Sequence, residues 1–220
     1  MAIEELDLDL STAQLPDDVS SLLEESERQW DQFFASQSNR RFPRFLPSDV
    51  ALVFTAIEYV TRHDLALGRV FCEWGSGLGT ATCLAALLGY EAYGIEIEAE
   101  LVELSRKMAR ALAIPVEILC ASYIPEGYES YSGVGGEDLV QSETFSYPGA
   151  AIDPEPRYDG MDIEIAAIDL FFVYPWPDEQ VLMQKLFDAV AIEGAILIAY
   201  YSAREICVYR KLPDEEDRFE

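Results

Sequence analysis

The residues with the clearest chemical potential form a glycine-rich run at positions 71–80, Phe-Cys-Glu-Trp-Gly-Ser-Gly-Leu-Gly-Thr. The apolar stretch Arg69–Trp74 predicts a strand before the glycines, and the small residues from Thr80 to Leu88 predict a helix after them. Glycines at such a turn can adopt positive φ and let the backbone approach a ligand closely. The first turn of the helix also offers free N–H groups. The run therefore predicts a ligand-binding turn at the end of a strand.

Two classes of ligand compete for this turn, and a purely structural strand–helix turn is the third interpretation. The dinucleotide fingerprint G-x-G-x-x-G requires glycine at position 80, where the chain has Thr80. Glu73, two residues before the first glycine, would repel a pyrophosphate but can accept hydrogen bonds near a cationic amino-acid group. The spacing favours a cationic ligand, and an NAD(P)-dependent oxidoreductase stays open as an alternative.

A second acid, Glu96, closes the next predicted strand, Glu91–Ile97. A carboxylate at this place can accept two hydrogen bonds from the vicinal hydroxyls of a ribose. Ligands of open α/β sheets bind at the carboxyl ends of the strands. We therefore expect Glu73, the glycines and Glu96 to line one crevice.

The run from about Leu46 to Ala113 resembles the cofactor-binding half of class I S-adenosylmethionine (SAM)-dependent methyltransferases. Their acidic ribose-binding residue corresponds to Glu96. Their motif I, (D/E)-x-G-x-G-x-G, is matched at every position, by Glu73, Gly75, Gly77 and Gly79.

This resemblance implies SAM as the cofactor, with its methionine end held by the turn from Glu73 to Gly79, Ser76 included. It also places Ser122 beside the adenine, at a position where many members of the family have Asp. The function implied is methyl transfer from SAM to an acceptor that the sequence does not identify. A non-catalytic protein with the same SAM-binding fold is the first alternative.

The resemblance also implies that the methyl acceptor binds beside the run DLFFVYPWPDE, residues 169–179. Amino-group methyltransferases have (D/N/S)-P-P-(Y/F) here, but Val173 and Tyr174 occupy the first two positions, so the polar side chain is missing. The run also resembles the D-P-W-P segment of tRNA guanine-N7 methyltransferases, with Tyr174 in place of the Asp. In-line methyl transfer needs positioning and no metal.

Three residues of this run are candidate catalytic residues. Tyr174 and Asp178 are candidate bases, and Trp176 is a candidate surface on which the acceptor stacks. Asp178 has a second interpretation, as the N-cap of the helix that follows.

The elements that must position these residues alternate between strands and helices from Gly68 onward, which predicts parallel βαβ units. We expect an α/β fold: a doubly wound, mostly parallel sheet of the class I methyltransferase type in a three-layer α/β/α sandwich. The five parallel strands should have the order 3-2-1-4-5. Because only Glu205–Arg210 follows them as a strand, where the family has a pair, we expect a truncated sheet.

The 220 residues fit one domain with additions. Residues 1–47 are predicted to form an N-terminal segment, in which a loosely held acidic tail, residues 1–16, precedes a helix. Residues 48–220 are predicted to form the SAM-binding methyltransferase domain. Within it, residues 123–162 form an insertion, for which a lid over the acceptor site is favoured over a floppy loop.

The formal net charge is −26. Such a chain repels phosphate backbones, so we expect no nucleic-acid partner and favour a protein side chain or a small molecule as acceptor. The acidity has two interpretations, a cationic partner or adaptation to high salt. The chain has three lysines, Lys107, Lys185 and Lys211, which favours the second.

Localisation and metal binding are predicted from what the sequence lacks. The acidic start MAIEELDLDL has no features of a signal peptide, and no apolar block approaches the length of a membrane span, so we expect a cytoplasmic protein without a membrane partner. His63 is the single histidine, and the four cysteines form no C-x-x-C pair. We therefore expect no metal site and reduced cysteines.

Overall fold

The computed structural model describes residues 1–10, 15–35, 48–126, 157–176, 179–201 and 205–213. Within these residues, seven strands form one sheet in the order β1-β7-β6-β5-β2-β3-β4. The strands are β1 (Ile3–Leu6), β2 (Val70–Trp74), β3 (Glu91–Glu96), β4 (Glu117–Cys120), β5 (Leu170–Val173), β6 (Ile196–Tyr201) and β7 (Glu205–Lys211). The helices are α1 (Asp17–Ala35), α2 (Val50–Arg62), α3 (Thr80–Leu87), α4 (Ala99–Ala111) and α5 (Gln180–Val190).

The five central strands, β4-β3-β2-β5-β6, are parallel, and β7 pairs with β6 in the antiparallel direction. Taken in chain order these five strands run 3-2-1-4-5 across the sheet, so the predicted order is confirmed. Their composition explains the arrangement, because strands covered on both faces must be apolar throughout. All six residues of β6 and all four of β5 are buried.

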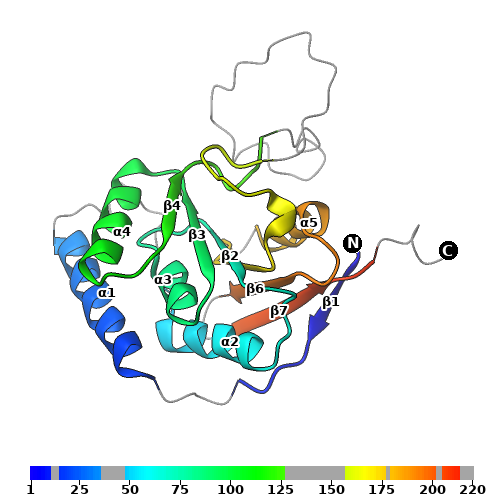
Figure 1. Cartoon of the computed structure of the whole chain (residues 1–220), viewed down its shortest axis with the longest axis horizontal. Coiled ribbons are helices and arrows are strands. Elements are labelled where there is room, and N and C mark those ends of the chain that lie inside the picture. The colour runs from blue at the N-terminus through cyan, green and yellow to red at the C-terminus, as the bar shows by residue number, and fades with distance from the viewer. Residues whose placement is uncertain (11–14, 36–47, 127–156, 177–178, 202–204, 214–220) are drawn as a thin grey trace, which may run out of the picture.

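Helices cover both faces of the sheet, which confirms the α/β/α sandwich (Figure 1). Apolar residues of α1, α2, α3 and α4 join one core cluster with alternate residues of the strands, such as Phe71 and Phe172. The intervening strand residues, such as Cys72 and Phe171, form a second cluster with α5. The segment around Tyr158 and Ile168 completes that second layer.

The N-terminal segment supplies the strand at one edge of the sheet. Strand β1 pairs antiparallel with β7, from Ile3 opposite Lys211 to Leu6 opposite Val208. The expectation of a loosely held tail is therefore wrong for these residues, and so is the expectation of a truncated sheet. This strand could not be predicted from the sequence because it is short, acidic and largely exposed. The division of the chain after residue 47 stays a prediction, but β1, from the N-terminal segment, lies in the same sheet as the strands of residues 48–220.

One acid on α5 anchors this edge. Asp188 Oδ1 accepts hydrogen bonds from Ala2 N at 2.8 Å and from Lys211 Nζ at 3.0 Å. The Lys211 side chain is buried, so its ammonium is held in a place where an unpaired charge would be costly. Leu212 N also donates to Ala2 O at 2.7 Å. Asp188 thus joins the start of β1 to the end of β7.

The predicted insertion, residues 123–162, is described only at its two ends. Glu126 and Arg157 exchange both main-chain hydrogen bonds, at 2.8 and 3.1 Å, and their side chains pair at 3.5 Å. The two ends are therefore held together by an antiparallel bridge. The predicted lid falls mostly on residues 127–156, which lie outside the described residues. Among the helices that the structure describes, none is long and apolar enough to span a membrane.

Replacing Asp188 by alanine should weaken the whole sheet edge. The variant removes the acceptor shared by Ala2 N–H and the Lys211 ammonium, so the free energy of unfolding should fall by about 1–3 kcal/mol. Urea unfolding measures this change. Glu193→Gln, at an exposed acid beyond α5, is the control and should shift the value by less than about 0.5 kcal/mol. An unchanged stability in Asp188→Ala would show that the anchor contributes nothing.

Candidate functional site

The glycine-rich turn lies between the end of β2 and the start of α3, as predicted. Gly75, Gly77 and Gly79 have φ values of +71°, +54° and +71°, a region that side chains with a Cβ rarely adopt. A Cβ on Gly79 would fall 2.1 Å from Ser105 Oγ on α4, whereas one on Gly75 would meet no atom within 4 Å. Gly79 therefore serves close packing, and Gly75 faces open space where a ligand can approach.

The Glu73 side chain, at the end of β2, accepts hydrogen bonds from the first turn of α3. The side chain is buried, and Oε2 accepts hydrogen bonds from Thr82 N at 2.8 Å and Thr82 Oγ1 at 2.6 Å. Burial raises the pKa of this carboxyl to about 8, although the two bonds from Thr82 act in the opposite direction. The structure thus gives Glu73 a capping role that the sequence did not predict. Its predicted role beside the methionine end of a ligand stays a prediction.

Glu96 joins the end of β3 to the glycine turn. Its Oε2 accepts from Gly77 N and its Oε1 from Glu98 N, both at 2.9 Å. Burial raises the pKa of the carboxyl, and the main-chain donors act in the opposite direction. Each carboxylate oxygen has a second lone pair, so Glu96 can hold the turn and still accept a hydrogen bond from a ligand hydroxyl.

The register of the sheet brings the two acids together. Glu73 lies opposite Gly94 in the parallel pair of β2 and β3, and Glu96 follows two residues later on the same face. The negative charge of Glu96 is one cause of the raised pKa of Glu73. The predicted convergence of both acids at the glycine turn is therefore what the structure shows.

Gly94 is a residue of this site that the sequence analysis missed. A Cβ at this position would fall 2.8 Å from both Thr82 Oγ1 and Ile118 Cδ1, and 3.0 Å from Ser76 Cβ. Only glycine lets the first turn of α3 and the glycine turn pack this closely on β3. A glycine inside an apolar strand was the available signal, since it marks close approach of another segment.

The two predicted cofactor-binding serines differ in their surroundings. Ser76 lies in the turn and is buried, and within the described residues its Oγ has no hydrogen-bond partner. Ser122 follows β4 and is partly exposed, and its Oγ accepts from Ile124 N at 3.1 Å. Ser122 therefore forms a local turn at the place where an acid is common in the family. Contact of either serine with a ligand stays a prediction.

The candidate acceptor residues follow β5, directly beside the turn. Because Val173 pairs with Trp74, Tyr174 lies next to Gly75 at the same edge of the sheet. The ring of Tyr174 meets that of Tyr200 on β6 edge-on, with centroids 4.7 Å apart and planes at 75°. Burial raises the pKa of Tyr174. The sequence analysis missed Tyr200 because its ring partner, Tyr174, lies after β5 in a separate segment of the chain.

Trp176 and Asp178 are described to different degrees. Trp176 is partly exposed, and its carbonyl oxygen accepts from Glu179 N at 2.8 Å. Glu179 is the residue before the first turn of α5, so the position of Trp176 is tied to that helix. Asp178 lies outside the described residues, and both its catalytic and its capping interpretation stay predictions.

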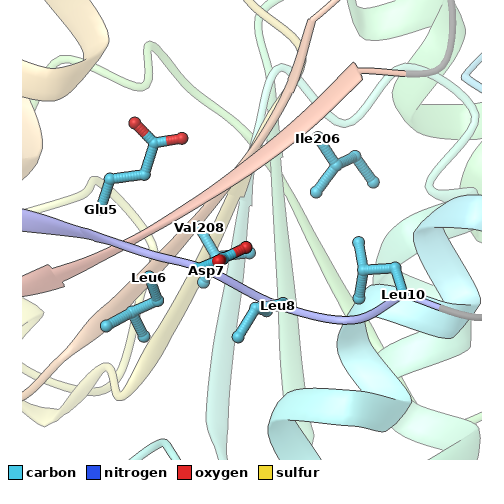
Figure 2. A pocket seen from close by; sticks show the side chains of 7 residues that line it. All are labelled: Glu5, Leu6, Asp7, Leu8, Leu10, Ile206 and Val208. Carbon is cyan, nitrogen blue, oxygen red and sulfur yellow. The ribbon is translucent and has the colours of Figure 1, made fainter.

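A separate hollow of about 340 Å³ lies where β1 leaves β7. Figure 2 shows Leu6, Leu8 and Leu10 along the N-terminal segment, with Ile206 and Val208 on β7. Strands β6 and β5 separate this edge from β2 and the glycine turn. The hollow is therefore not part of the candidate site.

Comparison with known proteins bears on the fold. No family model and no curated protein sequence matches the chain. The strand order with an antiparallel β7 next to β6 is that of the class I methyltransferase fold, and this is the fold of the chain.

Solved structures similar to the chain include an RNA methyltransferase from Salinibacter ruber in complex with S-adenosyl-L-homocysteine. The two sequences are 17% identical, the match covers 77% of this chain and 95% of that chain, and the TM-score is 0.48. An O-methyltransferase from Bacillus cereus has 11% identity, coverages of 84% and 66%, and a TM-score of 0.45. The 16S rRNA N2 G1207 methyltransferase of T. thermophilus has 14% identity, coverages of 78% and 45%, and a TM-score of 0.44.

One expectation needs correction in this light. We expected no nucleic-acid partner from the net charge of −26. Proteins named for their action on RNA are among the structures similar to this chain, so that exclusion is wrong. The physical reason is that net charge describes the average field of the whole chain, whereas an acceptor meets the local field of one edge of the sheet.

The raised pKa of Glu73 predicts a specific dependence of stability on pH. Between its ordinary pKa of 4.5 and the folded-state pKa of about 8, the folded protein keeps a proton that the unfolded chain releases. The free energy of unfolding should therefore fall as the pH rises through this window, by up to about 1.4 kcal/mol per pH unit from this group.

Urea unfolding of the wild type and of Glu73→Gln across the window measures this contribution as the difference between the two slopes. The variant should lack it. Glu117→Gln, at an exposed acid on β4, should keep the wild-type slope. Parallel curves for the wild type and Glu73→Gln would show that Glu73 does not hold a proton in the folded state.

Proposed function

We propose that this chain is a SAM-dependent methyltransferase. The observation that carries the proposal is the hydrogen bond from Gly77 N to Glu96 Oε2, which joins the glycine turn to an acid at the end of the neighbouring strand. A turn that faces open space at Gly75 and an acid that can still accept a hydrogen bond beside it suit a nucleoside with a flexible cationic chain.

The charge of the site supports SAM over a dinucleotide. Glu73 and Glu96 are both buried against the turn. Among the described residues, their hydrogen-bond donors are main-chain N–H groups and the Thr82 hydroxyl, and none is an Arg or Lys side chain. A cationic ligand lowers the pKa of both acids and is attracted by their ionised forms, so the pair favours a ligand with an ammonium and a sulfonium, whereas a pyrophosphate would be repelled by the ionised forms. This argues against the NAD(P)-dependent oxidoreductase.

In the proposed complex, the turn with Gly75, Ser76 and Gly77 holds the methionine end of SAM, Glu96 accepts from the ribose, and Ser122 lies beside the adenine. SAM supplies a methyl group on a positively charged sulfur. A lone pair of the acceptor forms the new bond to the methyl carbon while the carbon–sulfur bond breaks. The electron pair stays on sulfur, and S-adenosylhomocysteine is the product.

The residues after β5 suit positioning of the acceptor better than base catalysis. A tyrosine acts as a base only as a phenolate, and burial makes that form of Tyr174 rarer at neutral pH. Its hydroxyl can instead donate a hydrogen bond, while its ring and that of Trp176 offer surfaces for stacking. We therefore propose that Tyr174 and Trp176 orient an acceptor whose lone pair is available at neutral pH.

A non-catalytic SAM-binding protein is the second candidate. The observation that favours it is Val173, a buried apolar residue at the position where amino-group methyltransferases have a polar side chain. Incubation with methyl-labelled SAM and separate pools of protein, RNA and small-molecule acceptors distinguishes the two. Label in any pool supports the enzyme, whereas affinity for SAM without transfer to any pool supports the binding protein.

Gly75→Ala should lower the affinity for S-adenosylhomocysteine by at least about tenfold, because its methyl group enters the space that the ligand needs. Isothermal titration calorimetry measures this. Gly89→Ala is a matched control, since Gly89 is also exposed, has φ of +87° and has no atom within 4 Å of the added Cβ. Both variants place a Cβ on a residue with positive φ, so the site is the difference between them.

Two results of this titration would refute the proposal. One is a wild type that binds neither SAM nor S-adenosylhomocysteine at millimolar concentration. The other is a wild type that binds NADH or NADPH instead.

Cys120 gives an independent test of where the ligand lies. It is the register partner of Glu96 and the one exposed cysteine, whereas Cys72 and Cys83 are buried and Cys207 is half-buried. Iodoacetamide should therefore alkylate Cys120 first, and saturating S-adenosylhomocysteine should slow this reaction. Peptide mass spectrometry measures both rates.

Cys207 is the control for this experiment, because burial raises its pKa to about 11 and it lies on β7, away from the turn. Its slow alkylation should not respond to the ligand. An alkylation rate of Cys120 that the bound ligand leaves unchanged would place the binding site elsewhere.

A further inference from the structure

Helix α1 packs directly on the glycine turn. Phe33 of α1, Leu78 of the turn and Leu101 of α4 form a small buried cluster separate from the two main cores. Trp30 and Leu104 pack against it, and the rings of Trp30 and Phe33 are parallel within 2°, with centroids 6.0 Å apart. A helix assigned from the sequence to a separate N-terminal segment thus contacts Leu78, which lies between the second and third glycines of the predicted cofactor motif.

A second contact reaches the other side of Gly79. Ser26 Oγ on α1 lies 3.0 Å from Thr80 Oγ1, at the first residue of α3. The two contacts of α1, at Leu78 and Thr80, therefore bracket Gly79. The opposite end of the turn, at Gly75, is left open. Helix α1 covers one side of the turn and leaves free the side on which a ligand can lie.

A turn with three glycines in the left-handed region needs such support. Glycine loses more conformational freedom on folding than any other residue, so a turn of this composition has many accessible conformations. The Glu96 side chain fixes Gly77 through a single hydrogen bond, which Gly77 N donates to Oε2. Contacts at Leu78 and Thr80 remove further freedom, and a turn ordered before binding loses less entropy when the ligand arrives.

We propose that Phe33 and Ser26 of α1 are positioning residues that hold the glycine turn in its ligand-binding conformation. This rests on the proposed function of the turn as the SAM site. The two residues act through Leu78 and Thr80. If they are lost, only a fraction of the molecules has the turn in the competent conformation, and the apparent dissociation constant rises by the inverse of that fraction.

The first test compares two truncations on the same helix. Phe33→Ala should raise the dissociation constant for S-adenosylhomocysteine about five- to tenfold, as expected if 10–20% of the molecules keep the turn competent. Leu22→Ala removes a fully buried side chain of α1 that packs in the main core, away from the turn. It should destabilise the protein and leave the dissociation constant unchanged. Phe33→Leu should restore most of the affinity.

The second test needs no ligand. Amide hydrogen exchange in the free protein should be faster at residues 75–80 in Phe33→Ala than in the wild type, and not in Leu22→Ala. The Gly77 amide is the most informative probe, since it donates to buried Glu96. This readout stands even if the protein does not bind SAM, so failure of the inference and failure of the proposed function can be told apart.

A milder pair of variants covers the case in which Phe33→Ala does not fold. Ser26→Ala removes the contact with Thr80 without a large cavity, and Ser21→Ala removes an exposed hydroxyl of α1 that bonds Asp17 O. Faster exchange at residues 75–80 in Ser26→Ala alone supports the proposal. Equal exchange in both serine variants, or equal dissociation constants for Phe33→Ala and Leu22→Ala, would overturn it.

Discussion

Hydrogen bonds from main-chain N–H groups to two buried carboxyl groups are the interactions on which the site depends. Glu96 binds the turn at Gly77, and Glu73 binds the first turn of α3 at Thr82. Both acids are buried, which raises their pKa values, and the main-chain donors act in the opposite direction by stabilising the ionised form. The turn, the helix and two strands are therefore fixed together, and a change in either acid affects all four.

The sequence predicted those parts of the fold that are encoded locally. The glycine turn, the acid at the end of β3 and the order of the parallel strands follow from short motifs and from the alternation of strands and helices. The convergence of Glu73 and Glu96 followed as well, because parallel strands end at a common edge. These predictions needed no knowledge of which distant residues meet.

The parts that could not be predicted depend on contacts between distant segments. Strand β1 is too short and acidic to be recognised without its partner β7. The packing of Phe33 on Leu78 and of Tyr200 on Tyr174 joins separate elements, and no spacing in the chain specifies either pair. The net charge misled in the same way, because an average over the chain says nothing about the field at one edge.

The pairing of β1 with β7 has a consequence for the order in which the protein is assembled. Ile3 is synthesised well before Lys211, yet the two residues are neighbours in the sheet. Nascent chains can fold the βαβ core early, but this edge closes only after β7 has left the ribosome. Until then β1 has no strand to pair with, and its acidic residues discourage premature association with other nascent chains.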